Sequence, residues 1–232
     1  MSIAQRLETV RARLGAACDS GGRDPDQVHL IAVSKTKPAS AIREAYAAGQ
    51  RDFGENYAQE LRDKAAELAD LPGIRWHFIG HLQRNKVKYA TNAKAFRVHA
   101  VDSVKLAEEI ARRGPGTGVL VEVNVAGEAS KSGVPYEQAL ALCAELHALA
   151  DVDLRGLMCI PPADDQPDHW FARMAQLQAV GQARGLPLDE LSMGMSGDFE
   201  QAVARGATWV RVGTAIFGSR NPVKAVVGAL RG

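Results

Sequence analysis

The sequence has few cysteines and no long apolar run, and each shortage excludes a class of protein. Its three cysteines, Cys18, Cys143 and Cys159, are odd in number and form no CxxC pair, so neither a disulfide framework nor a zinc knuckle is indicated. We expect three buried, reduced thiols, because free cysteine behaves as a small hydrophobic residue. No apolar stretch approaches the roughly 20 residues of a bilayer span or resembles a signal peptide. The sequence therefore predicts a cytoplasmic protein that does not enter the membrane.

An excess of charge of one sign is also missing. Lysine and arginine total 28 against 27 aspartate and glutamate, so no global field would draw the protein to nucleic acid or to an anionic membrane. We expect a small-molecule partner instead. The sequence contains no GxSxG, HExxH, Walker loop or GxGxxG motif. Serine hydrolysis, zinc proteolysis and common nucleotide binding therefore lose their usual markers.

What the sequence does contain is an alternation of short apolar runs with longer segments of helical periodicity. A first amphipathic helix places apolar residues at helical spacing from Ile3 to Ala17 and ends at Gly21-Gly22. Eight apolar runs follow, which we interpret as strands: 28–33, 51–53, 75–79, 96–101, 119–125, 153–160, 190–193 and 209–212. The segments that favour helices are 39–48, 55–69, 84–90, 104–112, 136–149, 169–184 and 198–204, with one more at 221–230.

This alternation predicts the fold class, which is α/β. Runs that are apolar at successive positions, such as Leu30-Ile31-Ala32-Val33, suit parallel strands that are covered on both faces. Eight strand–helix repeats fit closure into a (β/α)₈ TIM-type barrel, here with an additional N-terminal helix. An open, doubly wound sheet is the alternative. No segment reads as a linker, so we expect one domain over residues 1–232.

Active sites of such barrels form at the carboxyl ends of the strands, and the first run ends at a lysine, Lys35. Because Lys35 lies at the end of a strand with four successive apolar residues, separated from them only by Ser34, we expect it to be partly desolvated, which favours the neutral amine that attacks an aldehyde. An ordinary solvated loop lysine is the simpler alternative. Lys37 lies beside Pro38, where a helix should begin, and is expected to be exposed.

The last two strands also lead into helices through small residues and hydroxyls. These loops are the recurrent phosphate site of the fold, because amides at a helix N-terminus point at an anion and small residues allow its close approach. Ser196, Gly213 and Thr214 are therefore candidate phosphate ligands. Alternatively, Ser196 is only a helix cap and Gly213 only a tight turn.

Other charged and polar residues lie near strand ends. Arg211 lies within an apolar strand and needs a partner, either a cofactor ring nitrogen or a carboxylate in a structural ion pair. His77 and His81 would be spread along a strand and its loop, so we interpret them as supporting residues and not as metal ligands. The simplest interpretation of the nearby basic cluster is a solvated helix face, although it could receive an anion: Arg84, Lys86 and Lys88.

Five motifs, in order and at plausible spacing over nearly the whole chain, resemble those of the pyridoxal phosphate homeostasis protein family. They are LIAVSKTKP (30–38), FGENY (53–57), WHFIGHLQRNK (76–86), LSMGMS (191–196) and VRVGTAIFG (210–218). The resemblance implies a barrel like the N-terminal domain of alanine racemase. It also implies pyridoxal 5′-phosphate (PLP) on Lys35, phosphate contacts from Ser196, Gly213 and Thr214, a ring-nitrogen contact from Arg211, and Asn56 close to the cofactor.

The family is regarded as binding and distributing the vitamin B6 cofactor without an established reaction, so the resemblance favours a carrier over an enzyme. An arginine at the ring nitrogen disfavours its protonation and makes the ring a poorer electron sink. A PLP-dependent amino-acid racemase would also need an opposite-face base from a second domain, for which no tyrosine can be assigned: Tyr46, Tyr57, Tyr89 and Tyr136. A Schiff-base aldolase acting on a phosphorylated sugar is a weaker alternative. We expect a monomer that meets PLP-dependent apoenzymes only transiently.

Overall fold

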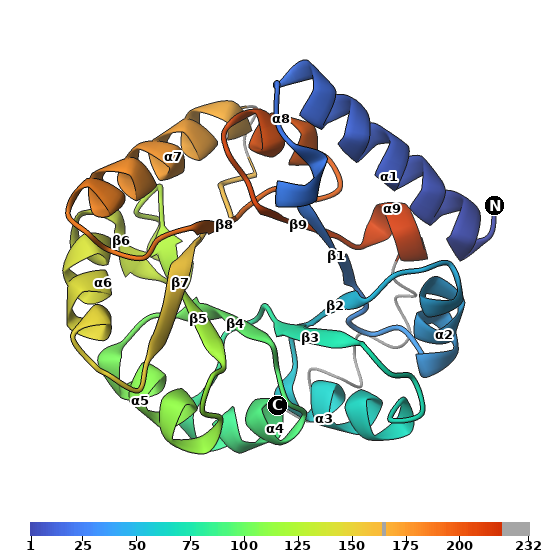
Figure 1. The fold of residues 1–232 in the computed structure, drawn as a ribbon, viewed down its shortest axis with the longest axis horizontal. Coiled ribbons are helices and arrows are strands. Elements are labelled where there is room, and N and C mark those ends of the chain that lie inside the picture. Colours follow the sequence, from blue (N-terminus) through green and yellow to red (C-terminus); the bar gives the residue numbers. More distant parts are fainter. Residues whose placement is uncertain (164–165, 220–232) are drawn as a thin grey trace.

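A closed barrel of eight parallel strands forms the centre of the computed structural model, which describes residues 1–163 and 166–219. Each strand pairs in parallel with the next, and the pairings β1–β9 and β4–β5 close the ring (Figure 1). The barrel strands are β1 (His29–Val33), β2 (Asp52–Glu55), β3 (Arg75–Phe78), β4 (Arg97–Val101), β5 (Gly118–Asn124), β7 (Asp153–Met158), β8 (Glu190–Ser192) and β9 (Trp209–Val212). The predicted barrel is confirmed, and the open sheet is excluded.

Helices form an outer ring around these strands (Figure 1). They are α1 (Ile3–Ser20), α2 (Ala39–Ala47), α3 (Ala58–Glu67), α4 (Val87–Asn92), α5 (Val104–Arg113), α6 (Ala139–His147), α7 (Pro167–Ala183), α8 (Phe199–Ala204) and α9 (Thr214–Phe217). Short 3₁₀ turns cover Pro25–Gln27, Arg84–Lys86 and Tyr136–Gln138, and a two-residue strand, β6 (Val134–Pro135), pairs with β5 outside the ring. None of these described helices is long and apolar enough to cross a bilayer.

One helix prediction needs correction, one helix was missed, and one predicted helix lies outside the described residues. The helix predicted over 55–69 begins only at Ala58, because Glu55 completes β2 by pairing with Phe78 of β3. Helix α9 was not predicted, since four residues are too short to show a helical period. The helix predicted over 221–230 lies outside the described residues.

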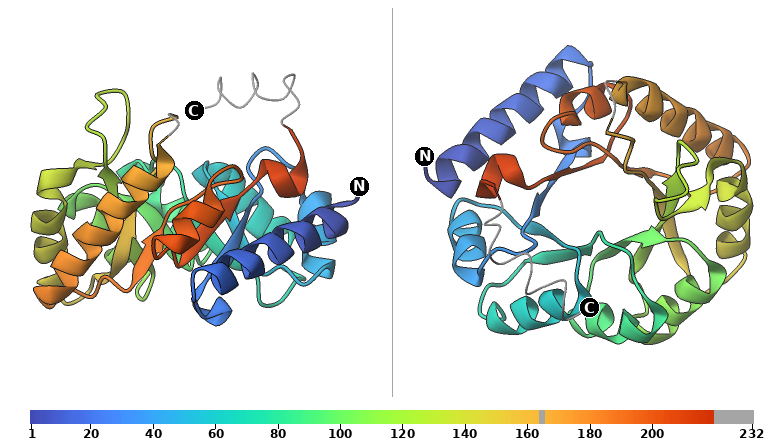
Figure 2. Two further views of the ribbon diagram at one scale, coloured as in Figure 1. Left: turned by 90° about the horizontal axis from the view of Figure 1, so that it is seen from above. Right: turned by 180° about the vertical axis from the view of Figure 1, so that it is seen from behind.

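Helix α1 covers the outside of the barrel where its last and first strands meet. Ser2 and Gln5 form a capping box at its start, which satisfies free backbone amides. Its apolar stripe, from Ile3 to Cys18, is buried, and the helix packs against α2, α8 and α9 (Figure 2). All three cysteines are buried free thiols, as expected, and burial raises the pKa of Cys143 and Cys159 to about 12.

The buried apolar side chains form one large cluster and two small ones among the described residues. Most of the large apolar ones, such as Phe53, Phe78, Phe171 and Phe199, pack in one core cluster with helix residues. Smaller clusters, one of them Ala100, Leu120 and Met158, stand apart from it. The strands also bury a set of polar side chains: Asp52, His77, His99, Ser192 and Arg211. Burial of so many polar groups requires hydrogen-bond partners, and most of these lie within the set itself.

Candidate functional site

Lys35 lies where the sequence predicts, two residues beyond the carboxyl end of β1, and it is half-buried. The Ser34 amide donates to the carbonyl of Gly54, which continues the pairing with β2 past the end of the strand. Thr36 then takes a left-handed conformation with φ of 63°. This conformation is unfavourable for a residue with a β-branched side chain and has to be held by its surroundings.

A buried cluster of charges holds this turn. Glu60 Oε1 accepts from the Thr36 amide at 2.7 Å. The Lys64 ammonium donates to the Ser34 carbonyl, to Glu55 and to Glu60, each at 2.7 Å. Glu55 also accepts from the Ser34 hydroxyl at 2.6 Å. Burial raises the pKa of Glu55 to about 7, against the opposing effect of Lys64. Side chains of α3 and β2 therefore hold the backbone segment that carries Lys35.

Lys37 differs from its prediction. It is half-buried, and its ammonium donates to the carbonyls of Phe217, Gly218 and Ser219 at 3.1, 3.1 and 3.0 Å. The carbonyls at the end of a helix lack partners within it and attract a cation. Lys37 therefore ties the loop after β1 to the end of α9, which explains why it is not exposed.

Arg211 is 4% exposed, and its two recorded contacts are neutral. Nη1 donates to Ser192 Oγ at 2.7 Å, and Nη2 donates to the Cys159 carbonyl at 2.8 Å. Burial lowers the pKa of the Arg211 guanidinium. Because neither contact is a carboxylate, the alternative of a structural ion pair is not formed among the described residues. A buried positive charge held in this way suits an acceptor on a ligand.

The loops after β8 and β9 meet, as a shared phosphate site requires. The Ala215 amide points at Ser196 Oγ across 3.4 Å, and the Arg211 amide donates to the Gly194 carbonyl. Ser196 is not the cap of α8, because Asp198 occupies that position. A Cβ at Gly213 would lie 3.3 Å from the Val33 carbonyl oxygen. The small residue therefore lets this loop approach the end of β1, next to Lys35.

Asn56 follows β2 and carries an unpaired atom. Its Oδ1 is buried without a hydrogen-bond partner among the described residues. The Asn56 backbone is packed against Gly80, where a Cβ would come within 2.4 Å of the Asn56 carbonyl oxygen. A buried acceptor with no donor is costly unless a ligand supplies one, so Asn56 is a candidate ligand contact.

These residues come from four neighbouring strands, in the order β2, β1, β9 and β8. Carboxyl ends of parallel strands meet at one mouth of the barrel. That mouth therefore brings together the residues predicted from sequence, with Thr214 exposed in the first turn of α9: Lys35, Asn56, Ser196, Arg211, Gly213 and Thr214. A primary amine, a pair of small-residue loops, an unpaired amide oxygen and a guanidinium fit a phosphorylated aldehyde with a ring nitrogen.

The two histidines of the third motif have different surroundings. His77 is fully buried and bonded to His99 and Asp52, whereas His81 is exposed, with Nδ1 3.8 Å from Asp102. Within residues 1–163 and 166–219, no three histidine, cysteine, aspartate or glutamate side chains are grouped as a metal site. In the basic cluster, Arg84 and Lys88 are exposed and Lys86 is partly buried, which fits a solvated face.

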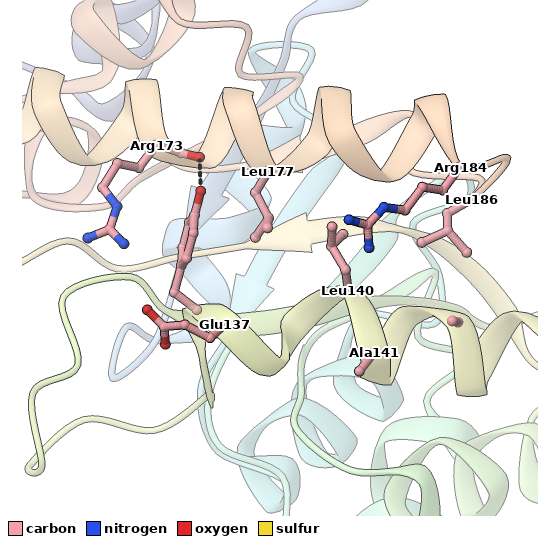
Figure 3. Close-up of a pocket in the computed structure, with 9 residues that line it drawn as sticks. Glu137, Leu140, Ala141, Arg173, Leu177, Arg184 and Leu186 are labelled. Atoms are coloured by element: carbon pink, nitrogen blue, oxygen red, sulfur yellow. Dashed lines mark hydrogen bonds between the residues drawn. The ribbon is translucent and has the colours of Figure 1, made fainter.

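Two hollows in the surface lie at different places on the barrel. One of about 740 Å³ lies among loops at the carboxyl ends of the strands, beside Met195 and Asp198. Another, of about 510 Å³, lies between α6 and α7 on the outer wall, where Tyr136 donates to the Arg173 carbonyl (Figure 3). Neither of these two hollows is lined by Lys35, Asn56, Ser196, Arg211, Gly213 or Thr214, so the candidate site is identified by its side chains and not by a hollow.

Comparison with known proteins agrees with this geometry. The family model of the alanine racemase N-terminal domain matches residues 7–221. Alanine racemase of Corynebacterium glutamicum shares the fold at 17% identity, with a TM-score of 0.66 over 92% of this chain and 62% of that one. The fold and its match therefore define the class, a barrel of the alanine racemase N-terminal type.

More similar relatives narrow the class to a family. The pyridoxal phosphate homeostasis protein of Pseudomonas aeruginosa is 49% identical over 225 residues, which covers 95% of this chain and 96% of the relative. That of Escherichia coli K12 is 42% identical over 228 residues, covering 94% and 97%. The structure of PipY from Synechococcus elongatus with PLP bound is 42% identical, with a TM-score of 0.78, over 94% of this chain and 100% of that one. This chain belongs to the pyridoxal phosphate homeostasis protein family.

Proposed function

We propose that this protein binds PLP and serves in vitamin B6 homeostasis, holding the cofactor as a Schiff base on Lys35 for storage or delivery. The observation that carries the proposal is the meeting of the amine of Lys35, the two small-residue loops and Arg211 at one mouth of the barrel. The homologous PipY structure, which contains PLP, supports the choice of cofactor.

Each site residue has a separate part in this proposal. Ser196, Gly213 and Thr214 hold the phosphate, because the loop amides and hydroxyls can donate to it. Arg211 donates to the ring nitrogen, and Asn56 supplies its unpaired Oδ1 to a donor of the cofactor. When bound, PLP would supply an aldehyde carbon that is attached reversibly to an amine.

A carrier is favoured over a racemase by the properties of Arg211. A permanently charged donor at the ring nitrogen disfavours protonation there and weakens the ring as an electron sink. Two tyrosines are engaged away from the mouth, with the Tyr46 hydroxyl bonded to the Pro72 carbonyl and that of Tyr136 to the Arg173 carbonyl. We propose no catalytic reaction for this protein.

Further parts of the proposal concern the cellular setting. Three buried free thiols suit a reducing compartment, so we propose the cytoplasm. PLP-dependent apoenzymes are the proposed transient recipients, and a single-domain monomer is the proposed working form. Sedimentation of the PLP-loaded protein tests the last point, since a dimer would sediment as a particle of twice the mass.

Reduction with borohydride tests the attachment. After incubation with PLP, reduction and proteolysis, we expect mass spectrometry to place the label on Lys35 alone. A label on Lys37, or none, would contradict the proposal. Visible aldimine absorbance of the protein as purified would contradict the aldolase alternative. A racemase would exchange the α-proton of L-alanine in deuterated water at about 1 per second or faster, and we expect no such exchange.

A further inference from the structure

An unbroken chain of buried polar side chains runs from Arg211 to Asp52 through the strands of the barrel. Arg211 Nη1 donates to Ser192 Oγ at 2.7 Å, and Ser192 Oγ lies 2.8 Å from His99 Nδ1. His99 Nε2 lies 2.9 Å from His77 Nδ1, and His77 Nε2 lies 2.9 Å from Asp52 Oδ1. All five side chains are buried, with Asp52 the most exposed at 6%.

The chain connects the two ends of the barrel. Asp52 is the first residue of β2, whereas the PLP site lies beyond the carboxyl ends of the strands. Arg75, whose side chain is 43% exposed, binds both oxygens of Asp52 at 2.7 and 2.6 Å. The last member of the chain therefore forms an ion pair near the amino-terminal face.

The two terminal groups fix the direction of every hydrogen bond. A guanidinium only donates, and a carboxylate only accepts. Burial by itself would raise the pKa of Asp52, but its bonds to His77 and Arg75 lower that pKa overall, so Asp52 is a carboxylate. His77 must then carry its proton on Nε2 and accept at Nδ1 from His99 Nε2. His99 Nδ1 accepts in turn from the Ser192 hydroxyl.

Both imidazoles remain neutral in this arrangement. Burial lowers the pKa of His77 and places that of His99 well below its ordinary value. A neutral imidazole has one donor and one acceptor, and each is used once here. The Ser192 proton therefore points to His99, which leaves the oxygen lone pairs for Arg211. Because an arginine keeps its protons, the chain cannot conduct a proton out of the mouth.

We propose that Asp52, His77, His99 and Ser192 are positioning residues that fix the Arg211 guanidinium toward the ring nitrogen of PLP. The inference rests on the proposed function, because it concerns the same bound cofactor. It assigns a role at the cofactor to an ion pair at the opposite end of the barrel. The two neutral histidines connect this ion pair to Arg211, because the donor and acceptor of each of their hydrogen bonds stay fixed while Asp52 is charged.

The first test needs no cofactor. In the apoprotein labelled with ¹⁵N-histidine, we expect His77 and His99 both to carry the proton on Nε2. A proton on Nδ1 of either ring would overturn the fixed direction. Asp52→Asn removes the group that can only accept, so its histidine signals should move toward the other tautomer or split. Asp70→Asn, which breaks the exposed bidentate pair with Arg43, is the matched control and should leave them unchanged.

The second test uses ¹⁵N-labelled PLP bound to the protein. We expect the ring nitrogen to be unprotonated in the wild type and in Asp70→Asn, and to move toward the protonated position in Asp52→Asn and Ser192→Ala. The dissociation constant of PLP should rise on the order of five-fold when a bond to Arg211 is lost, and Ser192→Thr, which keeps the hydroxyl, should restore the wild-type signal.

An unchanged ring-nitrogen signal in both Asp52→Asn and Ser192→Ala would overturn the inference. Should Asp52→Asn fail to fold, Ser192→Ala and its Ser192→Thr counterpart decide the question, since they alter the link between His99 and Arg211 and leave the ion pair of Asp52 with Arg75 in place. A wild-type protein that binds no PLP would instead refute the proposed function, while the histidine measurement would still report the direction of the chain.

Discussion

Glu55 makes the stability of this protein depend on pH in a way that can be separated from its other carboxylates. The pKa of Glu55 rises from its ordinary 4.5 to about 7 because the side chain is buried. The folded protein therefore binds this proton more tightly than the unfolded chain does. The resulting stabilisation is fully present below the unfolded pKa and is lost as the pH rises through about 7. The difference corresponds to about 3 kcal/mol.

The substitution Glu55→Gln removes this titration and keeps a group of the same shape that can accept from Ser34 and Lys64. Between about pH 4 and pH 8, the free energy of unfolding of the wild type should fall relative to that of Glu55→Gln by about 3 kcal/mol. Urea denaturation followed by circular dichroism measures both proteins at each pH. Taking the difference cancels the contributions of carboxylates that the two proteins share.

Glu67→Gln, at the end of α3, is the control, because Glu67 is exposed. Its pH profile should run parallel to that of the wild type. If Glu55→Gln also gave a parallel profile, Glu55 would titrate alike in the folded and unfolded chains. The burial argument, and with it the description of the cluster under Lys35, would then be wrong.

Three further substitutions test separate contacts. Gly80→Ala would bring a Cβ within 2.4 Å of the Asn56 carbonyl oxygen, so urea denaturation should show a loss of about 1–3 kcal/mol and absorbance titration should show weaker PLP binding. Lys37→Met removes the ammonium that binds the carbonyls after α9; the free energy of unfolding should fall by about 1 kcal/mol, while the borohydride label stays on Lys35. Ser196→Ala should weaken PLP binding on the order of five-fold in equilibrium dialysis, whereas pyridoxal, which has no phosphate, should bind both proteins alike.

The strands could be predicted from sequence because a parallel barrel buries them on both faces. In β1, every residue from Leu30 to Val33 is buried, so the apolar run and the strand nearly coincide. Glu55 shows where this reasoning stops. Glutamate favours helices in isolation, but the backbone of Glu55 pairs with β3 as part of β2. The charge of its buried side chain is compensated by Lys64 of α3. From the sequence alone, a lysine at that position of a helix is expected in solvent. Tertiary contacts therefore place Glu55 in a strand and not in a helix.

The residues at the strand ends could also be located, whereas their supports could not. Lys35, Ser196 and Gly213 lie in the loops that follow strands, and the fold brings all such positions to one mouth. His99 and Ser192 carry no comparable signal, because both lie within strands and the sequence does not show which side chains they contact. Their contact joins β4 to β8, which are not neighbours in the sheet. This contact across the interior could be recognised only from the structure of the closed barrel.

The short strand β2 shows how support for the site and stability of the fold are divided. Of its four residues, only Phe53 adds a large apolar side chain to the core, and Gly54 leaves room for Ile31, which a Cβ would approach to 2.8 Å. Asp52 ends the chain that reaches Arg211, and Glu55 holds the segment before Lys35. Asn56 follows directly. The two proposed cofactor contacts, Arg211 and Lys35, are therefore both supported from one strand. Substitutions of the polar residues of β2 should change PLP binding more than substitutions elsewhere in the core that destabilise the fold by the same free energy.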